Sequence, residues 1–209
     1  MPPRYARSTT IHGDPRSVAT ATAFVRDEVV PEVAAMAGCT GLSLLADSDS
    51  GTCIVTTSWL DEAAMHASQE GVAASAARTA EVLGGRPELQ EWEVAAMHRV
   101  PEAGHGARSR VTWLRTGPDA VDRAVDAVRL SLMPKLDDLP GFCSVSVMVR
   151  RAEGLTVAAV SYDSSADLEQ AREGAREFRE AFAPALGIEV LDSAEFDVPI
   201  AHLRVPETT

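Results

Sequence analysis

The stretch of sequence that decides the fold is residues 134–162, PKLDDLPGFCSVSVMVRRAEGLTVAAVSY, because it repeats residues 31–59, PEVAAMAGCTGLSLLADSDSGTCIVTTSW. The offset between the two stretches is 103 positions (134 − 31). Extended outward without a gap, this offset makes sixteen of the seventy positions from 15 to 84 identical, where roughly five are expected at average residue frequencies. Self-similarity at one fixed offset indicates a tandem duplication of a structural unit.

Composition sets the class of protein. The 209 residues, 45% of them hydrophobic, suit two units of about one hundred residues, each able to bury a core. No apolar run approaches the roughly 18 residues of a membrane span, and the N-terminus lacks the apolar segment of a signal peptide. We therefore expect a cytoplasmic protein. A net charge of −12 disfavours nucleic acid and membrane partners, and three cysteines without metal-ligand spacing predict no metal site.

Each repeat is predicted to run strand, helix, strand, strand, helix, strand. The first copy has expected strands at 5–12, 41–47, 52–60 and 91–100, with helices at 16–37 and 61–83. The second copy has expected strands at 108–115, 142–151, 155–162 and 195–205, with helices at 118–138 and 165–186. Apolar residues at three- and four-residue spacing predict the helices. Pro31 is expected to kink or divide the first helix, and Asp61 to cap the second.

This element order specifies a ferredoxin-like unit, a four-stranded antiparallel sheet with both helices on one face. The repeat predicts domains at 1–100 and 108–209, joined by a short Gly-rich linker, 101–107. The uncovered sheet face would be too apolar to leave in water, so we expect an α+β fold with the two units packed sheet to sheet. The chain would then be a monomer that forms an internal pseudo-dimer.

A family resemblance rests on Pro31 to Gly38 and Pro134 to Gly141, each followed by a hairpin, and on SWLDEAA at 58–64. With these features the chain resembles the dimeric α/β-barrel superfamily, and more closely its antibiotic-biosynthesis-monooxygenase-like domains. The resemblance covers nearly the whole chain, once per repeat. It implies a fused dimeric α/β barrel, and a cofactor-independent monooxygenase that acts on a small hydrophobic or aromatic compound. Two alternatives stay open: a non-catalytic protein that binds or senses a small molecule, and a haem-binding protein.

The haem-degrading members of this superfamily combine a first-strand Asn, a Trp ending the third strand and a His nine residues later. Trp59 matches the Trp, but Ser68 and Ala171 stand at the His position, and the chain contains no Asn. The resemblance therefore implies no haem-degrading site and no bound cofactor. Cofactor-free members also use polar first-strand residues, including Asn, to hold the oxidised ring.

The predicted catalytic residues are His98 and His202, which match when EWEVAAMH (91–98) is aligned with EFDVPIAH (195–202). Strand alternation places them on the face of Trp92 and Phe196, where an imidazole could accept a proton from a phenolic substrate. The alternative is a hydrogen-bonded histidine at a strand end.

The predicted substrate-binding residues are Trp59 and Tyr162, which end the third strands, and His12 and Arg115, which end the first strands. The aromatic pair would edge a pocket, and Arg115 would anchor a carboxylate or phenolate. The alternatives are core packing for the aromatic pair and a solvated rim for Arg115. Because Phe178 and Phe182 stand where the first copy has Ser75 and Thr79, we expect the larger cavity within residues 1–100, lined by Trp59.

Overall fold

The computed structural model of the chain describes residues 4–99, 106–136 and 138–203. Within those ranges the side chains at positions 118, 178, 179, 181–183, 185, 186, 202 and 203 are not described. The chain forms two compact units. Within the described residues, the first comprises 4–93 and 197–203, and the second comprises 94–196.

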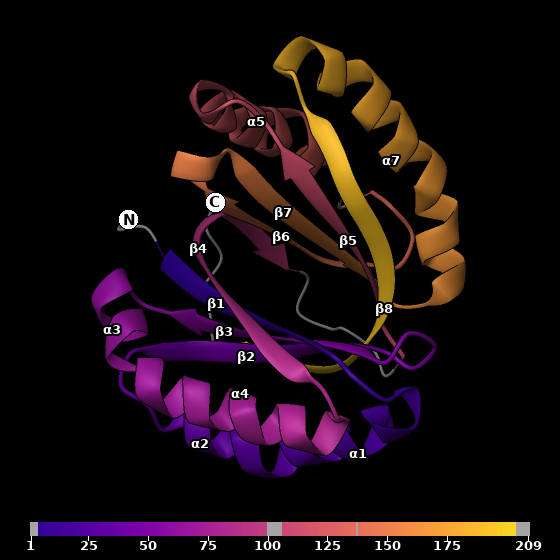
Figure 1. The fold of residues 1–209 in the computed structure, drawn as a ribbon. Coiled ribbons are helices and arrows are strands. Elements are labelled where there is room, and N and C mark those ends of the chain that lie inside the picture. The colour runs from indigo at the N-terminus through magenta and orange to yellow at the C-terminus, as the bar shows by residue number, and fades with distance from the viewer. Residues whose placement is uncertain (1–3, 100–105, 137, 204–209) are drawn as a thin grey trace. The chain divides into compact units, whose positions relative to one another are not determined.

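The elements of the first repeat follow the predicted order, shown in Figure 1. They are β1 (Arg4–His12), η1 (Pro15–Ser17), α1 (Val18–Phe24), η2 (Val25–Val29), α2 (Val30–Ala34), β2 (Cys39–Asp47), β3 (Thr52–Trp59), α3 (Glu62–Ala67), α4 (Gln69–Leu83) and β4 (Arg86–Arg99). The Asp61 carboxylate accepts a hydrogen bond from the Ala64 amide at 2.8 Å, which confirms the predicted cap. The second predicted helix is divided at Ser68 into α3 and α4.

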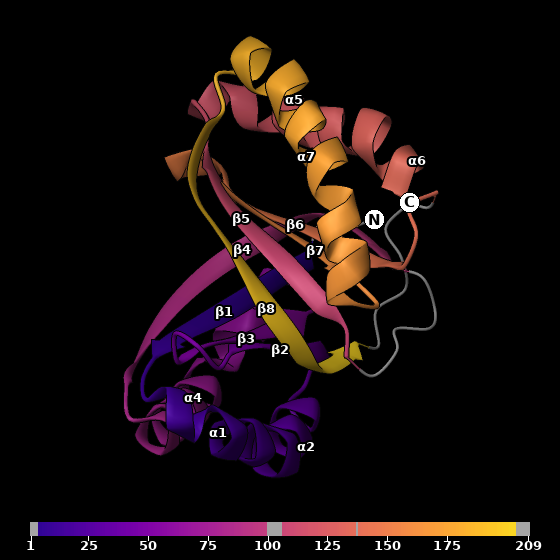
Figure 2. The same cartoon turned by 90° about the vertical axis from the view of Figure 1, so that its right-hand side faces the viewer.

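The second repeat has the same order of strands and helices. Its elements are β5 (Arg108–Arg115), η3 (Pro118–Ala120), α5 (Val121–Ala127), η4 (Val128–Leu132), α6 (Met133–Leu136), β6 (Phe142–Arg150), η5 (Arg151–Glu153), β7 (Leu155–Tyr162), α7 (Ser165–Leu186) and β8 (Glu189–Leu203). Figure 2 shows α5 and α7 on the same face of the sheet that contains β5 and β7.

The strands form one closed antiparallel barrel in the hydrogen-bonded order β1-β3-β2-β8-β5-β7-β6-β4. Within each repeat the third strand lies between the first and the second. Trp59 of β3 stands opposite Tyr5 and Cys39, and Tyr162 of β7 stands opposite Arg108 and Phe142. This arrangement confirms the predicted α+β fold class, a fused dimeric α/β barrel built from two ferredoxin-like units.

The last residues of β4 and β8 belong to a different compact unit from the rest of their sequence repeat. Residues 94–99 of β4 group with the second unit, and residues 197–203 of β8 group with the first, where Ile200 pairs with Leu44. The predicted domains, 1–100 and 108–209, therefore differ from the compact units at these strand ends. Most of the predicted linker, residues 101–105, lies outside the described residues.

Both fourth strands begin earlier than predicted, at Arg86 and Glu189. Residues 86–90 are mostly exposed and contain Pro87. A proline close to glycines is typical of a loop, so the sequence pattern did not predict a strand here.

A π-helical segment precedes the proline of each first helix. η2 ends just before Val30 and Pro31, and η4 lies at the same place in the second repeat, 103 positions later. Proline has no N–H to donate to the previous turn, so the helix adjusts its hydrogen bonding upstream. This division confirms the expected effect of Pro31. In the second repeat the segment lies against the cavity described next.

Candidate functional site

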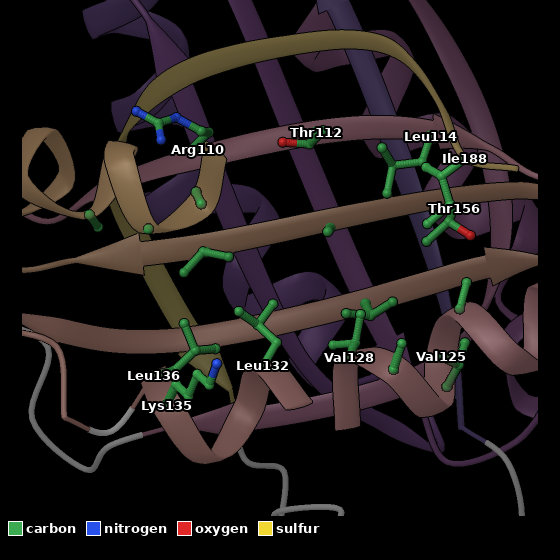
Figure 3. Close-up of a pocket in the computed structure, with 18 of the residues that line it drawn as sticks. Arg110, Thr112, Leu114, Val125, Val128, Leu132, Lys135, Leu136, Thr156 and Ile188 are labelled. Atoms are coloured by element: carbon green, nitrogen blue, oxygen red, sulfur yellow. The ribbon is translucent and has the colours of Figure 1, made fainter. Parts of the chain in front are cut away.

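A cavity of about 480 Å³ lies within the second unit, between the sheet and the helices of the repeat (Figure 3). Its sheet side consists mainly of alternate residues of two neighbouring strands, with one residue of β6. They are Arg110, Thr112 and Leu114 of β5, Thr156, Ala158, Val160 and Tyr162 of β7, and Val147 of β6. This alternation follows from the two-residue period of a strand. Its helix side includes Val125, Val128 and Leu132, so the lining is mainly apolar.

Small side chains leave this space open. Ala158 and Ala175 line the cavity, and the equivalent residues of the first repeat are Val55 and Val72. In the first repeat both valines are buried in a continuous apolar core. Gly174 also lines the cavity, and a methyl group added there would meet no atom within 4 Å. A cavity of this size falls within the range of sites that bind small molecules.

The equivalent space in the first unit is filled. A void of only about 10 Å³ remains between its helices and sheet, barely enough for one water. The prediction that the larger cavity lies within residues 1–100, lined by Trp59, is therefore wrong. Two valines in place of two alanines narrow this space in the first unit. The Phe178 and Phe182 side chains, on which the prediction rested, are outside the described set.

Arg110 is the charged residue of β5 that lines the cavity. Its Nη2 and Nε donate to Oε1 of Glu195 at 2.6 and 3.2 Å, and Arg172 donates to the same oxygen at 2.9 Å. Burial alone would raise the pKa of Glu195, but hydrogen bonds and positive charge from Arg110 and Arg172 outweigh it and lower the pKa below its usual value. Glu195 is therefore ionised at neutral pH and positions the guanidinium.

The first repeat contains the matching pair. Arg7 donates from Nη2 and Nε to Oε1 of Glu91 at 2.6 and 3.3 Å, which is nearly the same geometry. The sequence carries a signal for this pair: Arg7 and Arg110 are 103 positions apart, and Glu91 and Glu195 are 104 apart, the offset of the last strands. Sequence reasoning missed Arg110 because it sought polar residues at the ends of the first strands.

Tyr162 is the predicted residue that lines the cavity. It is buried, and burial raises the pKa of its phenol, while the charge of Arg110 acts in the opposite direction. The phenol therefore stays protonated at neutral pH and can donate a hydrogen bond. Its ring meets Phe142 edge-on, with centroids 6.3 Å apart, and the Phe142 ring stacks on His98 at 6.0 Å. His98 thus lies behind Phe142 and is not a cavity-lining residue.

The other predicted residues lie elsewhere. Trp59 is fully buried in the apolar core of the first unit, where its Nε1 donates to Oγ1 of Thr57 at 3.1 Å. His12 is exposed, with Nδ1 3.0 Å from Oγ1 of Thr52. Arg115 is exposed and lies 3.9 Å from Glu189. The side chain of His202 is outside the described set. Its backbone lies in β8 and pairs with Leu42 of β2.

Two hydroxyl groups lie toward the far end of the cavity from Arg110. Thr116 and Thr156 are buried lining residues, and neither Oγ1 atom has a hydrogen-bond partner among the residues that the structure describes. Figure 3 shows Thr156 beside Leu114 and Ile188, with Arg110 at the opposite end of the cavity. Unpaired buried hydroxyls are uncommon in native proteins, so this end can accept a polar ligand group.

No group of three or more His, Cys, Asp or Glu side chains is placed to hold a metal ion within the described part of the chain. Of the side chains that ligate haem iron in proteins, the described cavity lining includes a tyrosine, Tyr162, but no histidine, cysteine or methionine. Together with the absence of Asn from the chain, these residues do not fit a haem-degrading site. No helix among the described residues is long and apolar enough to span a membrane.

A duplicated ferredoxin-like unit closed into one barrel is the fold of a fused dimeric α/β barrel. Solved structures agree with this class. A "putative monooxygenase" from Lactobacillus acidophilus NCFM has a TM-score of 0.71 at 9% identity, with 97% of each chain covered. An anthrone oxidase-like protein has a TM-score of 0.65 at 16% identity, covering 96% of this chain and 91% of that one. These likenesses establish the fold.

Relatives in sequence define the family. No protein-family model matches the chain. Uncharacterized protein Rv2557 of Mycobacterium tuberculosis (strain ATCC 25618 / H37Rv) is 42% identical over 203 residues, covering 97% of this chain and 91% of the relative. Uncharacterized protein Rv2558 of the same strain is 44% identical over 208 residues, covering 97% and 86%. The chain belongs to the family of these two mycobacterial proteins.

Proposed function

We propose that the chain is a monooxygenase-like oxidoreductase that takes a small, mainly apolar aromatic compound into the cavity of its second repeat. The single observation that carries the proposal is the cavity of about 480 Å³, lined mainly by apolar side chains together with Arg110 and Tyr162. Apolar walls with a few polar groups are typical of small-molecule sites. The fold of the solved monooxygenase-like structures supports the reaction class.

The proposed reaction needs no bound cofactor. An electron-rich substrate such as anthrone loses a proton, and the resulting anion reacts with O₂. One oxygen atom enters the product as a carbonyl, and the other leaves as water with the two hydrogens of the substrate carbon. The guanidinium of Arg110 would stabilise the anion, and the Tyr162 phenol would donate to its oxygen. The apolar walls would keep water from competing for these contacts.

The proton acceptor in this proposal is Glu177, the carboxylate of α7 that lines the cavity. The predicted base His98 lies behind Phe142, whose hydrocarbon ring cannot relay a proton. Because His98 does not line the cavity, a binding or sensing function without chemistry is the second candidate. The two functions differ in turnover. A catalyst consumes O₂ with anthrone and loses most of that activity as Glu177→Gln, whereas a sensor binds anthrone without consuming O₂.

The test measures anthrone oxidation with an oxygen electrode and anthrone binding by fluorescence titration. In the double variant Ala158→Val/Ala175→Val, the two valines of the first repeat narrow the cavity, and we expect binding and oxidation to weaken together. The matched control is Ala77→Val, the same change at an exposed position of α4. Unchanged binding in the double variant would show that the cavity is not the site. Binding without oxygen uptake would establish the sensor instead.

A further inference from the structure

Arg7 and Arg110 occupy the same place in the two repeats but differ in how many of their donors are used. A guanidinium has five N–H donors. Arg7 uses four of them, two toward Glu91, one from Nη1 to Oγ of Ser68 at 3.2 Å and one from Nη2 to the Met65 carbonyl at 3.1 Å. Arg110 uses two, both toward Glu195. Its Nη1 has no partner among the described residues.

One substitution explains one of the two hydrogen bonds that Arg110 lacks. The position of Ser68 is occupied by Ala171 in the second repeat, so the hydroxyl that accepts from Arg7 has no counterpart. Ala171 itself lines the cavity. The Arg110 side chain is 11% exposed, whereas that of Arg7 is 2% exposed. The second repeat thus keeps the carboxylate that positions the arginine and lacks the hydroxyl that would complete its hydrogen bonding.

The orientation of Arg110 leaves the free donors available to a ligand. Glu195 occupies the edge of the guanidinium formed by Nε and Nη2, so the Nη1 edge is free. Figure 3 shows this guanidinium at one end of the cavity. An arginine with three unused donors beside apolar walls is suited to bind an oxyanion, because hydrogen bonds to charged groups are stronger where water is excluded.

We propose that Arg110 makes the second repeat selective for apolar compounds that carry one oxyanion, a carboxylate, phenolate or enolate, which docks on Nη1. This inference rests on the proposed function and specifies its substrate class. The other charged residues near this end are Arg172 and Glu195, already paired with each other, and Lys135 and Glu177 on the helix side of the lining. The apolar body of the ligand then extends along Leu132 and Val128 toward the threonine end.

The test compares two probes of similar size, 2-naphthoate and 2-ethylnaphthalene, by their own fluorescence at pH 7.5. Naphthoate carries an oxyanion and ethylnaphthalene carries no oxygen. We expect naphthoate to bind roughly tenfold more tightly or better, because charge-assisted hydrogen bonds contribute about 1.5–3 kcal/mol. In Ala171→Ser, the new hydroxyl would accept from Nη1 as Ser68 does in the first repeat. Naphthoate affinity should then fall several-fold, with ethylnaphthalene affinity nearly unchanged.

Two controls separate this explanation from others. Ala171→Cys adds similar bulk with a much weaker hydrogen-bond acceptor, and it should leave the preference for naphthoate in place. Ser68→Ala frees Arg7 in the filled first repeat and should create no naphthoate site. Two results would overturn the role of Arg110 and leave the binding function standing. One is equal affinity of the unmodified protein for both probes, and the other is an equal loss of naphthoate affinity in Ala171→Ser and Ala171→Cys. If neither probe binds the unmodified protein, the proposed function itself fails.

Discussion

Arg110 holds Glu195 through two nitrogen atoms that donate to one carboxylate oxygen, Nη2 at 2.6 Å and Nε at 3.2 Å. The pair Arg7 and Glu91 repeats this contact at 2.6 and 3.3 Å. In each repeat the contact joins the first strand to the fourth strand of the same compact unit. The ion pair is therefore common to both repeats, whereas the cavity lies in the second repeat and the equivalent space of the first is filled.

The first prediction concerns acid stability. The pKa values of Glu91 and Glu195 are both lowered below the usual value, because their arginine partners outweigh the effect of burial. A carboxyl group with a depressed folded-state pKa adds stability above its unfolded pKa, about 4.3, and loses it as the pH falls through the lower folded value. The free energy of unfolding should therefore fall from about pH 5 downward.

Replacing both carboxyl groups tests this source of the pH dependence. Glu91→Gln/Glu195→Gln should be less stable than the natural chain at pH 7 and should show a smaller loss between pH 5 and pH 3, measured by urea unfolding. Glu88→Gln/Glu189→Gln, at exposed positions of the same strands, is the control. If Glu91→Gln/Glu195→Gln lost as much unfolding free energy between pH 5 and pH 3 as the natural chain, these two carboxyl groups would not be the source of the pH dependence.

The second prediction concerns thiol reactivity. Burial raises the pKa of the Cys53 thiol to about 11, and burial together with a hydrogen bond to Asp163 raises that of Cys143 to about 12. The thiolate is the reactive form, so both residues should resist a thiol-specific reagent at pH 8 in the folded protein. Mass spectrometry should find these two cysteines labelled only after unfolding in urea. Rapid labelling of either one in the native state would contradict the structure.

Local sequence patterns predicted the order of the elements. Glycines with positive φ recur at the repeat offset, at Gly51 and Gly154 in the hairpins and at Gly84 and Gly187 after the second helices. Only glycine adopts this backbone conformation without strain, so the turns could be placed from sequence. The grouping of β4 and β8 could not, because hydrogen bonds between residues distant in the chain leave no local pattern.

The site was harder to predict than the fold. The prediction gave weight to large aromatic residues such as Trp59, which proved to be a core residue. The cavity instead depends on the absence of methyl groups at Ala158 and Ala175, and small apolar residues are equally common in tightly packed helices. The free donors of Arg110 became visible only once Arg7 could be compared with it in three dimensions.

The third prediction uses two equivalent glycines. Gly174 lies within α7, and a Cβ added there would meet no atom within 4 Å. Alanine is favoured over glycine in a helix interior by about 0.5–1 kcal/mol, so Gly174→Ala should stabilise the protein by about that amount. Gly71→Ala is the matched control, because its Cβ would lie 2.6 Å from Cε of Met36 and that side chain would have to move. Thermal unfolding should show a clearly smaller gain in stability for Gly71→Ala than for Gly174→Ala. Equal gains in stability would show that the added methyl group is accommodated equally well at both positions.

The last prediction exchanges the residues that separate the filled unit from the open one. Val55→Ala removes two methyl groups from the buried core of the first unit and should destabilise the protein by about 1–3 kcal/mol, because the packed surroundings collapse only in part. Ala158→Val adds the same two groups to open apolar space, on a strand where valine is favoured, and should stabilise by about 0.5–1.5 kcal/mol. Urea unfolding of both single variants measures the two effects, and the double variant should give their sum, since the residues lie in separate cores. If Ala158→Val destabilised the protein, valine could not be accommodated there, and the space beside Ala158 would be smaller than the structure shows.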